Sequence, residues 1–168
     1  MFNRKKFKDI KSLINLSIVR VNQVRKKSLQ ELGVKKRLLA KHLQEDDYAL
    51  ARLEAERIVK LDWKIEAMNI LEIKCEEVRD NVPLLNTEKS VPPDMEEAVA
   101  SLIYAQSRAG VAELKEVVRL LERKYGAEFV QMQRNNGSKR VEEGHSFPQF
   151  CRQWEGQYIQ TPESKEEQ

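Results

Sequence analysis

Apolar residues recur at alternating steps of three and four over the first forty residues of the chain. This spacing keeps them on one side of an α-helix, so it predicts a helix over residues 5–44. Gly33 interrupts the pattern at a cost of about 1 kcal/mol relative to alanine. At about 1.5 Å per residue, the helix would be a rod of roughly 60 Å. The positions on its stripe are Phe7, Ile10, Ile14, Ser17, Val21, Val24, Ser28, Leu32, Leu39 and Leu43.

A second stripe with the same spacing predicts a helix over residues 48–82. A polar turn separates the two helices; in it, Asp46 or Asp47 could cap the second helix, and Pro83 is expected to end that helix. Two helices of matching length joined by a tight turn pack as antiparallel neighbours, so we expect one long hairpin. The stripe of the second helix consists of Ile58, Leu61, Ile65, Met68, Cys75 and Val82.

The C-terminal half of the second helix carries further apolar residues and should be covered on two sides. These residues are Ile70, Leu71 and Ile73. After a linker over residues 83–92, apolar spacing predicts three shorter helices. They are expected over residues 93–107, 111–124 and 127–133. With no strand pattern in the sequence, the predicted fold class is all-α: a long antiparallel two-helix hairpin with shorter helices packed at its open end.

The last part of the chain differs in composition from the helical core predicted over residues 5–134. Residues 135–158 predict a linker that could include one more docking helix, and residues 159–168 are polar enough to predict a disordered tail. The docking helix would use Phe147, Phe150, Trp154 and Tyr158, which are spaced at three and four.

Charge is distributed unevenly along the 168 residues. Residues 1–41 carry a net charge of +11, whereas residues 42–90 carry −5 and residues 91–168 carry −3. The acids of the second helix cannot neutralise the first, because that helix has bases of its own, so a positive surface should remain. Its candidate residues are Lys5, Lys6, Lys8, Lys11, Arg20, Arg25, Lys26, Lys27, Lys35, Lys36 and Arg37.

Such a surface has several possible partners and one purely structural explanation. Anionic lipid would gain about 1 kcal/mol per basic residue near the membrane, and acidic helices of a partner protein are equally suitable. Nucleic acid is less favoured, since only Phe2 and Phe7 are aromatic on this helix and no groove-reading motif is present. Alternatively, some of the bases pair with acids of the second helix, which contributes little stability.

The sequence contains no motif of catalysis or metal binding. His42 and His145 stand alone, and Cys75 and Cys151 each lack a second cysteine at metal-ligand spacing. Cys75 falls on an apolar stripe and is predicted to be a small core residue. The apolar runs are too short to cross a bilayer. We therefore expect no enzyme, no cofactor and no metal, and a reduced cytoplasmic setting.

Two stretches of the chain resemble a known family. Residues 52–78, RLEAERIVKLDWKIEAMNILEIKCEEV, and residues 96–130, EEAVASLIYAQSRAGVAELKEVVRLLERKYGAEFV, closely resemble the Ist family of increased-sodium-tolerance proteins. These are ESCRT-III-like regulators of the ESCRT AAA ATPase. The resemblance covers about residues 5–133, and its most specific blocks lie at 52–58, 66–72 and 97–105.

The resemblance implies an ESCRT-III-like core that assembles with charged multivesicular body proteins into polymers on anionic membranes, and a cytoplasmic protein recruited to endosomal membranes. Self-assembly is also implied. Family members carry C-terminal Leu/Arg-rich motifs that engage the ATPase, and this chain stops at Gln168 without one. Direct ATPase binding is therefore expected only if such a motif lies outside this chain. Residues 137–168 match the family's closing helix poorly.

The function predicted from these observations is a non-enzymatic scaffold that regulates the ESCRT AAA ATPase in endosomal sorting, membrane remodelling and abscission. The alternative is a monomeric helical adaptor or nucleic-acid-binding protein that uses the basic first helix. A partner groove is predicted within the family-like blocks; the alternative, favoured for several of these residues, is that they belong to the core. Its candidate residues are Glu66, Glu72, Leu102, Tyr104, Leu114 and Lys115.

Overall fold

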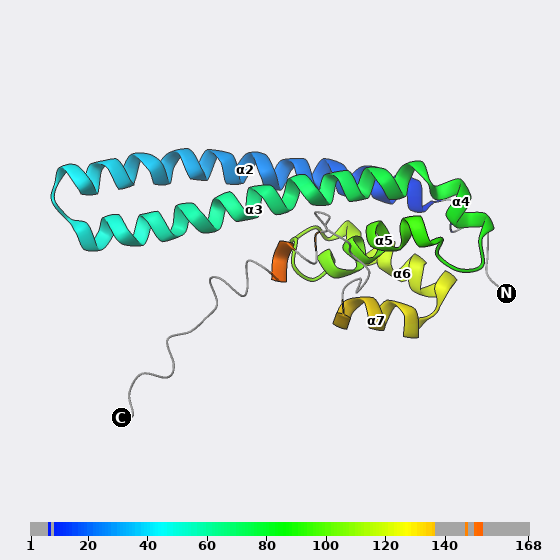
Figure 1. Cartoon of the computed structure of the whole chain (residues 1–168). Helices are drawn as coiled ribbons and strands as arrows, with labels where there is room; N and C mark the ends of the chain where they lie inside the picture. Colours follow the sequence, from blue (N-terminus) through cyan, green and yellow to red (C-terminus); the bar gives the residue numbers. More distant parts are fainter. Residues whose placement is uncertain (1–6, 8, 137–146, 148–149, 153–168) are drawn as a thin grey trace, which may run out of the picture.

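The computed structural model describes residues 7, 9–136, 147 and 150–152 of the chain. Two long helices, α2 (Ile10–Gln44) and α3 (Tyr48–Asp80), run side by side in opposite directions (Figure 1). With 35 and 33 residues, each helix is about 50 Å long. The predicted antiparallel hairpin is confirmed.

Two aspartates shape the turn that joins these helices. Asp46 has a backbone φ of 58°, a left-handed conformation that aspartate adopts more readily than most residues. The Asp47 carboxylate accepts a hydrogen bond from the backbone N–H of Leu50 at 3.1 Å, which caps the first turn of α3. Of the two predicted capping residues, Asp47 is therefore the one that caps.

Pro83 begins a helix, contrary to the prediction that it ends one. α3 ends at Asp80, and α4 (Val82–Thr87) occupies the first part of the stretch predicted to be a linker. Pro83 lies in the first turn of α4, where its missing N–H would have no helical acceptor in any case. The chain bends at Asn81, whose side-chain amide donates to the Glu77 carbonyl oxygen at 2.8 Å.

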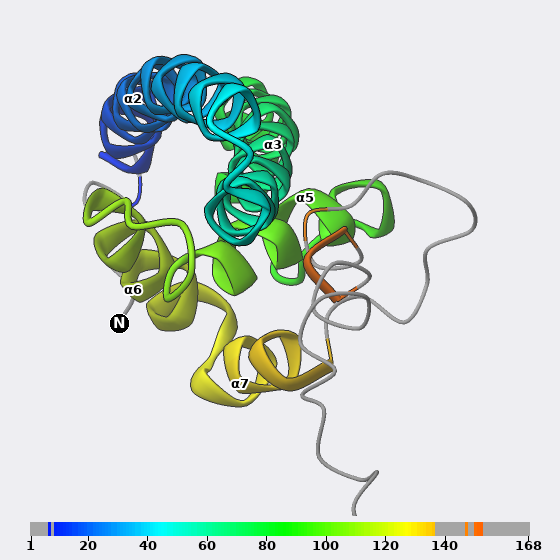
Figure 2. The ribbon, with the colours of Figure 1, turned by 90° about the vertical axis from the view of Figure 1, so that its left-hand side faces the viewer.

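Three further helices pack beneath the open end of the hairpin, in the half that carries α4 (Figure 1). α5 (Pro93–Ala105) packs on α3, α6 (Glu113–Tyr125) packs on α2, and α7 (Ala127–Asn136) packs on α5 and α6. Seen along the hairpin, α5 and α6 form a second layer and α7 a third (Figure 2). The three helices predicted here agree with the structure to within a few residues at each end.

The hydrophobic core lies where α5 is enclosed by its neighbours. Every residue of α5 from Ala98 to Ala105 is buried, because α3, α6 and α7 surround that helix. Each large apolar side chain that is fully buried contributes about 1.5–3 kcal/mol, so much of the stability is concentrated here. The hairpin adds to this core Ile10, Ile14, Val21, Met68, Leu71, Cys75 and Val78.

The apolar stripes are less buried toward the tip of the hairpin, which we define as residues 36–56. Leu43, predicted on the stripe of the first helix, is 49% exposed. Ile73, outside the tip, is 54% exposed although the sequence predicted cover for it, whereas Ile70 and Leu71 are buried as predicted. Two residues of helix turn Ile73 about 160° away from Leu71, so it faces neither α2 nor α5.

Candidate partner-binding surfaces

The basic residues predicted on the first helix divide into two groups. Arg25 and Lys35 pair with acids of α3, as the structural explanation proposed, whereas Arg20 pairs with Glu113 of α6. Five are exposed and form no ion pair within the described part of the chain: Lys11, Lys26, Lys27, Lys36 and Arg37. Lys5, Lys6 and Lys8 lie outside the described residues. The positive surface of α2 is therefore smaller than the sequence alone suggested.

Lys26, Lys27 and Arg37 form what we call the outer basic row. At 100° per residue they lie about 120–140° around α2 from the buried Leu32, and all three are exposed. Their side chains are thus directed away from α3 and accessible to a partner from solvent.

Arg25 and Glu72 belong to a polar clasp between the two long helices. The Arg25 guanidinium donates to the Glu72 carboxylate and, at 2.8 Å, to the side-chain oxygen of Asn69. Asn22 completes the clasp by donating to the other Glu72 oxygen at 2.8 Å. Glu72, a predicted groove residue, therefore has its carboxylate occupied, and the clasp fixes the register of α2 against α3.

A second polar clasp lies nearer the tip, around the buried Glu54. This residue is only 5% exposed, and its carboxylate lies 2.6 Å from the Arg57 guanidinium and 3.4 Å from the Lys35 ammonium. Burial by itself would raise the pKa of Glu54, but hydrogen bonds and charge from Arg57 and Lys35 outweigh it and hold the pKa below 4.5. Lys35 therefore forms an ion pair within the hairpin and is not part of the exposed basic surface.

The six predicted groove residues do not line one surface. Leu102, Tyr104 and Leu114 are buried in the core, which corrects their assignment to a groove. Their positions face the enclosed layer of α5 and α6, where apolar side chains are required for packing. Glu66 and Lys115 are exposed on α3 and α6.

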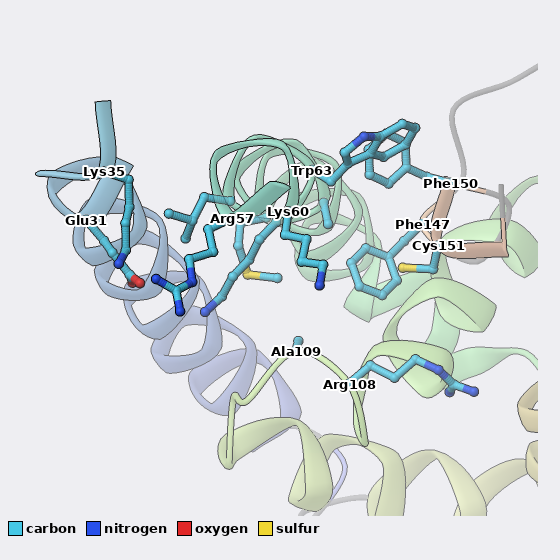
Figure 3. Close-up of a pocket in the computed structure, with 14 residues that line it drawn as sticks. Glu31, Lys35, Arg57, Lys60, Trp63, Arg108, Ala109, Phe147, Phe150 and Cys151 are labelled. Atoms are coloured by element: carbon cyan, nitrogen blue, oxygen red, sulfur yellow. The ribbon is translucent and has the colours of Figure 1, made fainter. Parts of the chain in front are cut away.

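A pocket of about 620 Å³ lies between the hairpin, the loop that joins α5 to α6, and the segment at Phe147 and Phe150 (Figure 3). One wall comes from α2 and α3 and another from the loop between α5 and α6. A third wall comes from the C-terminal segment at Phe147 and Phe150. The Phe150 ring packs on Trp63 with centroids 4.7 Å apart, and Phe147 is 6.4 Å from Tyr104. The two phenylalanines of the segment predicted to dock therefore contact α3 and α5; Trp154 and Tyr158 lie outside the described residues, and the docking helix itself stays a prediction.

Sequence reasoning did not find this pocket. Its walls come from four segments far apart along the chain, and no local spacing links Glu31 or Lys35 to Phe147 and Cys151. The aromatic residues at 147 and 150 gave the one usable signal, since aromatic side chains spaced along a helix are expected to pack against something.

These elements define an all-α protein built on a long helical hairpin. A long hairpin with shorter helices at its open end presents a basic row and a pocket. The described residues bring no three His, Cys, Asp or Glu side chains together as a metal site. No helix in the described ranges has the length and hydropathy needed to cross a membrane.

A family model, Ist1, described as "Regulator of Vps4 activity in the MVB pathway", matches residues 11–146, and the chain belongs to this family. An IST1-like protein of Dictyostelium discoideum is 27% identical over 117 residues, which are 70% of this chain and 32% of that protein. The chain thus spans about a third of the length of that curated relative.

A solved structure has the same fold. The N-terminal domain of Ist1 from S. cerevisiae, in complex with the Did2 MIM motif, aligns with a TM-score of 0.66 and 20% identity. The alignment covers 90% of this chain and 92% of that one. The predicted all-α, ESCRT-III-like fold class and the predicted family are both confirmed.

Proposed function

We propose that the chain is a non-enzymatic ESCRT-III-like scaffold. It assembles with charged multivesicular body proteins on membranes and so regulates the ESCRT AAA ATPase in endosomal sorting, membrane remodelling and abscission. Membership of a family described by regulation of Vps4 in the MVB pathway carries this proposal. The yeast Ist1 domain of the same fold was solved in complex with the Did2 MIM motif, which supports a role in binding motifs of other proteins.

The outer basic row gives this scaffold an electrostatic surface for anionic membranes or acidic partners. Lys26, Lys27 and Arg37 are exposed and engaged by no acid among the described residues. With about 1 kcal/mol per basic residue near an anionic surface, removing all three charges should weaken membrane association by roughly a hundredfold. Arg25 is excluded from this set because it holds the hairpin together.

The test is co-sedimentation and negative-stain microscopy of the purified chain with a charged multivesicular body subunit, with and without phosphatidylserine liposomes. We expect filaments or coated membranes with the wild type and their loss when Lys26, Lys27 and Arg37 are each replaced by Glu. The control reverses three exposed bases elsewhere, Lys89, Arg119 and Arg123, of which Arg119 is paired with Glu116, and should assemble normally.

Two results would contradict the proposal. One is a chain that stays in the supernatant under every condition. The other is tight binding to an oligonucleotide that weakens log-linearly with salt, which would instead favour the nucleic-acid-binding alternative.

A further inference from the structure

We propose that the pocket binds a single-chain anionic amphiphile, whose acyl chain lies in the pocket and whose phosphate-monoester head lies between Lys60 and Lys64. A lysophospholipid with such a head is a small molecule, and its binding is an activity separate from assembly with other proteins. The site therefore goes beyond the scaffold function proposed above and does not depend on it.

The uncharged part of the pocket lining is apolar. The uncharged side chains that line it belong to leucine, tryptophan, alanine, methionine, phenylalanine and cysteine. Among these described residues there is no amide or hydroxyl group that could recognise a sugar, a base or an inositol ring. The volume of about 620 Å³ lies in the range of small-molecule sites. The uncharged part of a matching ligand is therefore a hydrocarbon.

The apolar part of the lining is compact and does not continue as a strip along α3. Leu61 and Met68 lie beneath the pocket. The same side of α3 carries Arg57, Lys60 and Lys64 next to them. An apolar surface with positive charge along one border fits a ligand that has one hydrocarbon chain and one anionic end.

Lys60 and Lys64 are the positive groups available to that anionic end. Both are exposed, lie one helical turn apart and form no ion pair within the described part of the chain. Lys64 has no acid three or four residues away on α3, and Glu56, four residues before Lys60, lies 3.7 Å from Arg52. Two like charges at this spacing repel each other, so an anion between them is stabilised.

The other charged residues of the lining do not neutralise these two lysines. Lys35 and Arg57 are basic as well, and both are paired with Glu54. The acid in the lining, Glu31, points toward Lys35 and Arg57 in Figure 3. The Arg108 side chain extends away from the two lysines in the same view. Charge complementarity therefore specifies an anionic ligand at the lysine side of the pocket.

A phosphate monoester matches two lysines better than a carboxylate does. It carries a charge of about −1.5 to −2 near neutral pH and three acceptor oxygens, whereas a carboxylate carries a single charge. Figure 3 shows the Lys60 side chain reaching into the space between Phe147 and Ala109. A head bound there leaves the acyl chain to pack against Leu61 and Met68.

The shape of the site favours a single amphiphile over a bilayer surface. The pocket is a corner with walls from α2 and α3, from the loop at Ala109 and from the segment at Phe147 (Figure 3). A flat bilayer cannot enter such a corner, whereas one lipid molecule can place its chain in it. The ligand is therefore taken up as a monomer.

The test uses the fluorescence of Trp63, which lines the pocket with its ring centroid 4.7 Å from that of Phe150. Trp154→Phe leaves Trp63 as the single tryptophan of the chain. The full chain with this substitution would be titrated with lauroyl lysophosphatidic acid below the concentration at which micelles form. Two matched probes separate the parts of the ligand. Lauroyl lysophosphatidylcholine has the same chain on a zwitterionic head, and glycerol 3-phosphate has the head alone. We expect saturable binding of the first probe and binding at least about tenfold weaker of the other two.

Two sets of variants test the two parts of the site. Neutralising both lysines, Lys60→Gln with Lys64→Gln, should weaken binding of lysophosphatidic acid by about tenfold. The matched control neutralises two exposed lysines outside the pocket, Lys89→Gln with Lys115→Gln, and should bind as the unsubstituted chain does. Ala109→Leu places a larger side chain at the pocket and should abolish binding. Thermal melts show whether this variant is folded, and the lysine variants decide the question if it is not.

The two cysteines provide a readout of position. Cys151 lines the pocket, whereas Cys75 is buried and desolvation raises the pKa of its thiol to about 12, which keeps it unreactive. Bound lysophosphatidic acid should slow alkylation of Cys151, measured by mass spectrometry, with Cys75 unmodified throughout. Vesicles that contain diacyl phosphatidic acid should not slow it, because their lipids are held in a bilayer.

Four results would overturn the inference. The first is equal binding of the two lysolipids, and the second is binding of glycerol 3-phosphate as tight as that of lysophosphatidic acid. The third is unchanged affinity after neutralisation of Lys60 and Lys64. The fourth is protection of Cys151 by the vesicles and not by the monomer, which would assign this face to a membrane surface.

Discussion

The clasp around Arg25 and Glu72 allows a quantitative test of what holds the hairpin in register. Replacing Glu72 by Ala removes the acceptor for Asn22 and for Arg25. A hydrogen bond to a charged group contributes about 1.5–3 kcal/mol when shielded from water, whereas an exposed ion pair contributes about 0.2–1 kcal/mol. The Arg25 and Glu72 side chains are 26% and 22% exposed, so we expect the substitution to cost about 2 kcal/mol, between these limits.

A double-mutant cycle isolates the pair itself. The free energy of unfolding in urea would be measured for the wild type, Glu72→Ala, Arg25→Met and the double variant. We expect a coupling energy of about 1–2 kcal/mol. Glu72→Ala alone should lower the melting temperature by about 4–8 °C for a domain of this size. Glu76→Ala, an exposed acid on the same helix, is the matched control and should change little.

A coupling energy near zero would refute this account of the clasp. In that case Arg25 and Glu72 would stabilise the fold independently or not at all. The register of α2 against α3 would then depend on apolar packing alone.

Two further predictions follow from burial. Leu102→Ala should lower the free energy of unfolding by about 2–5 kcal/mol because Leu102 is fully buried, whereas Leu53→Ala, at a half-exposed position, should cost well under half as much in the same urea titration; equal losses would contradict the assigned core. The pKa of Glu54 is lower in the folded chain than its ordinary 4.5, so its contribution to stability is present above that value and is lost as the pH falls through the lower, folded-state pKa. Thermal melts from neutral to acid pH should therefore show a smaller loss of stability for Glu54→Gln than for the wild type, and parallel curves would contradict the pairing.

The sequence predicted most of the fold because the hairpin depends on local periodicity. Apolar steps of three and four located both long helices, and the acidic turn narrowed the cap to Asp46 or Asp47, of which the structure shows Asp47. The prediction for Pro83 was wrong because proline occurs both after the end of a helix and in the first turn of one. The turn at Asn81 ends α3 before Pro83, so that Pro83 lies in the first turn of α4. The continuous apolar run of α5 could have indicated burial on all sides, since a helix without a polar face is enclosed.

The candidate surfaces were harder to predict than the fold. Family-like blocks contain core residues as well as surface residues, so the resemblance alone placed Leu102, Tyr104 and Leu114 in a groove although they pack inside. The net charge of the first helix follows from the number of its bases. It does not show which of these bases lie next to an acid across the hairpin. The pocket depends on tertiary contacts between distant segments, which no pattern within one helix reveals.

The uneven burial along the hairpin has a mechanical consequence. At the root of the hairpin, α2 and α3 are held by α5 and α6 as well as by each other, whereas at the tip, among the helices that the structure describes, each packs only on the other. The free energy needed to open backbone hydrogen bonds locally falls where few apolar contacts must be broken. The hairpin is therefore held more firmly at its root than at its tip. The tip can therefore open locally while the root stays folded.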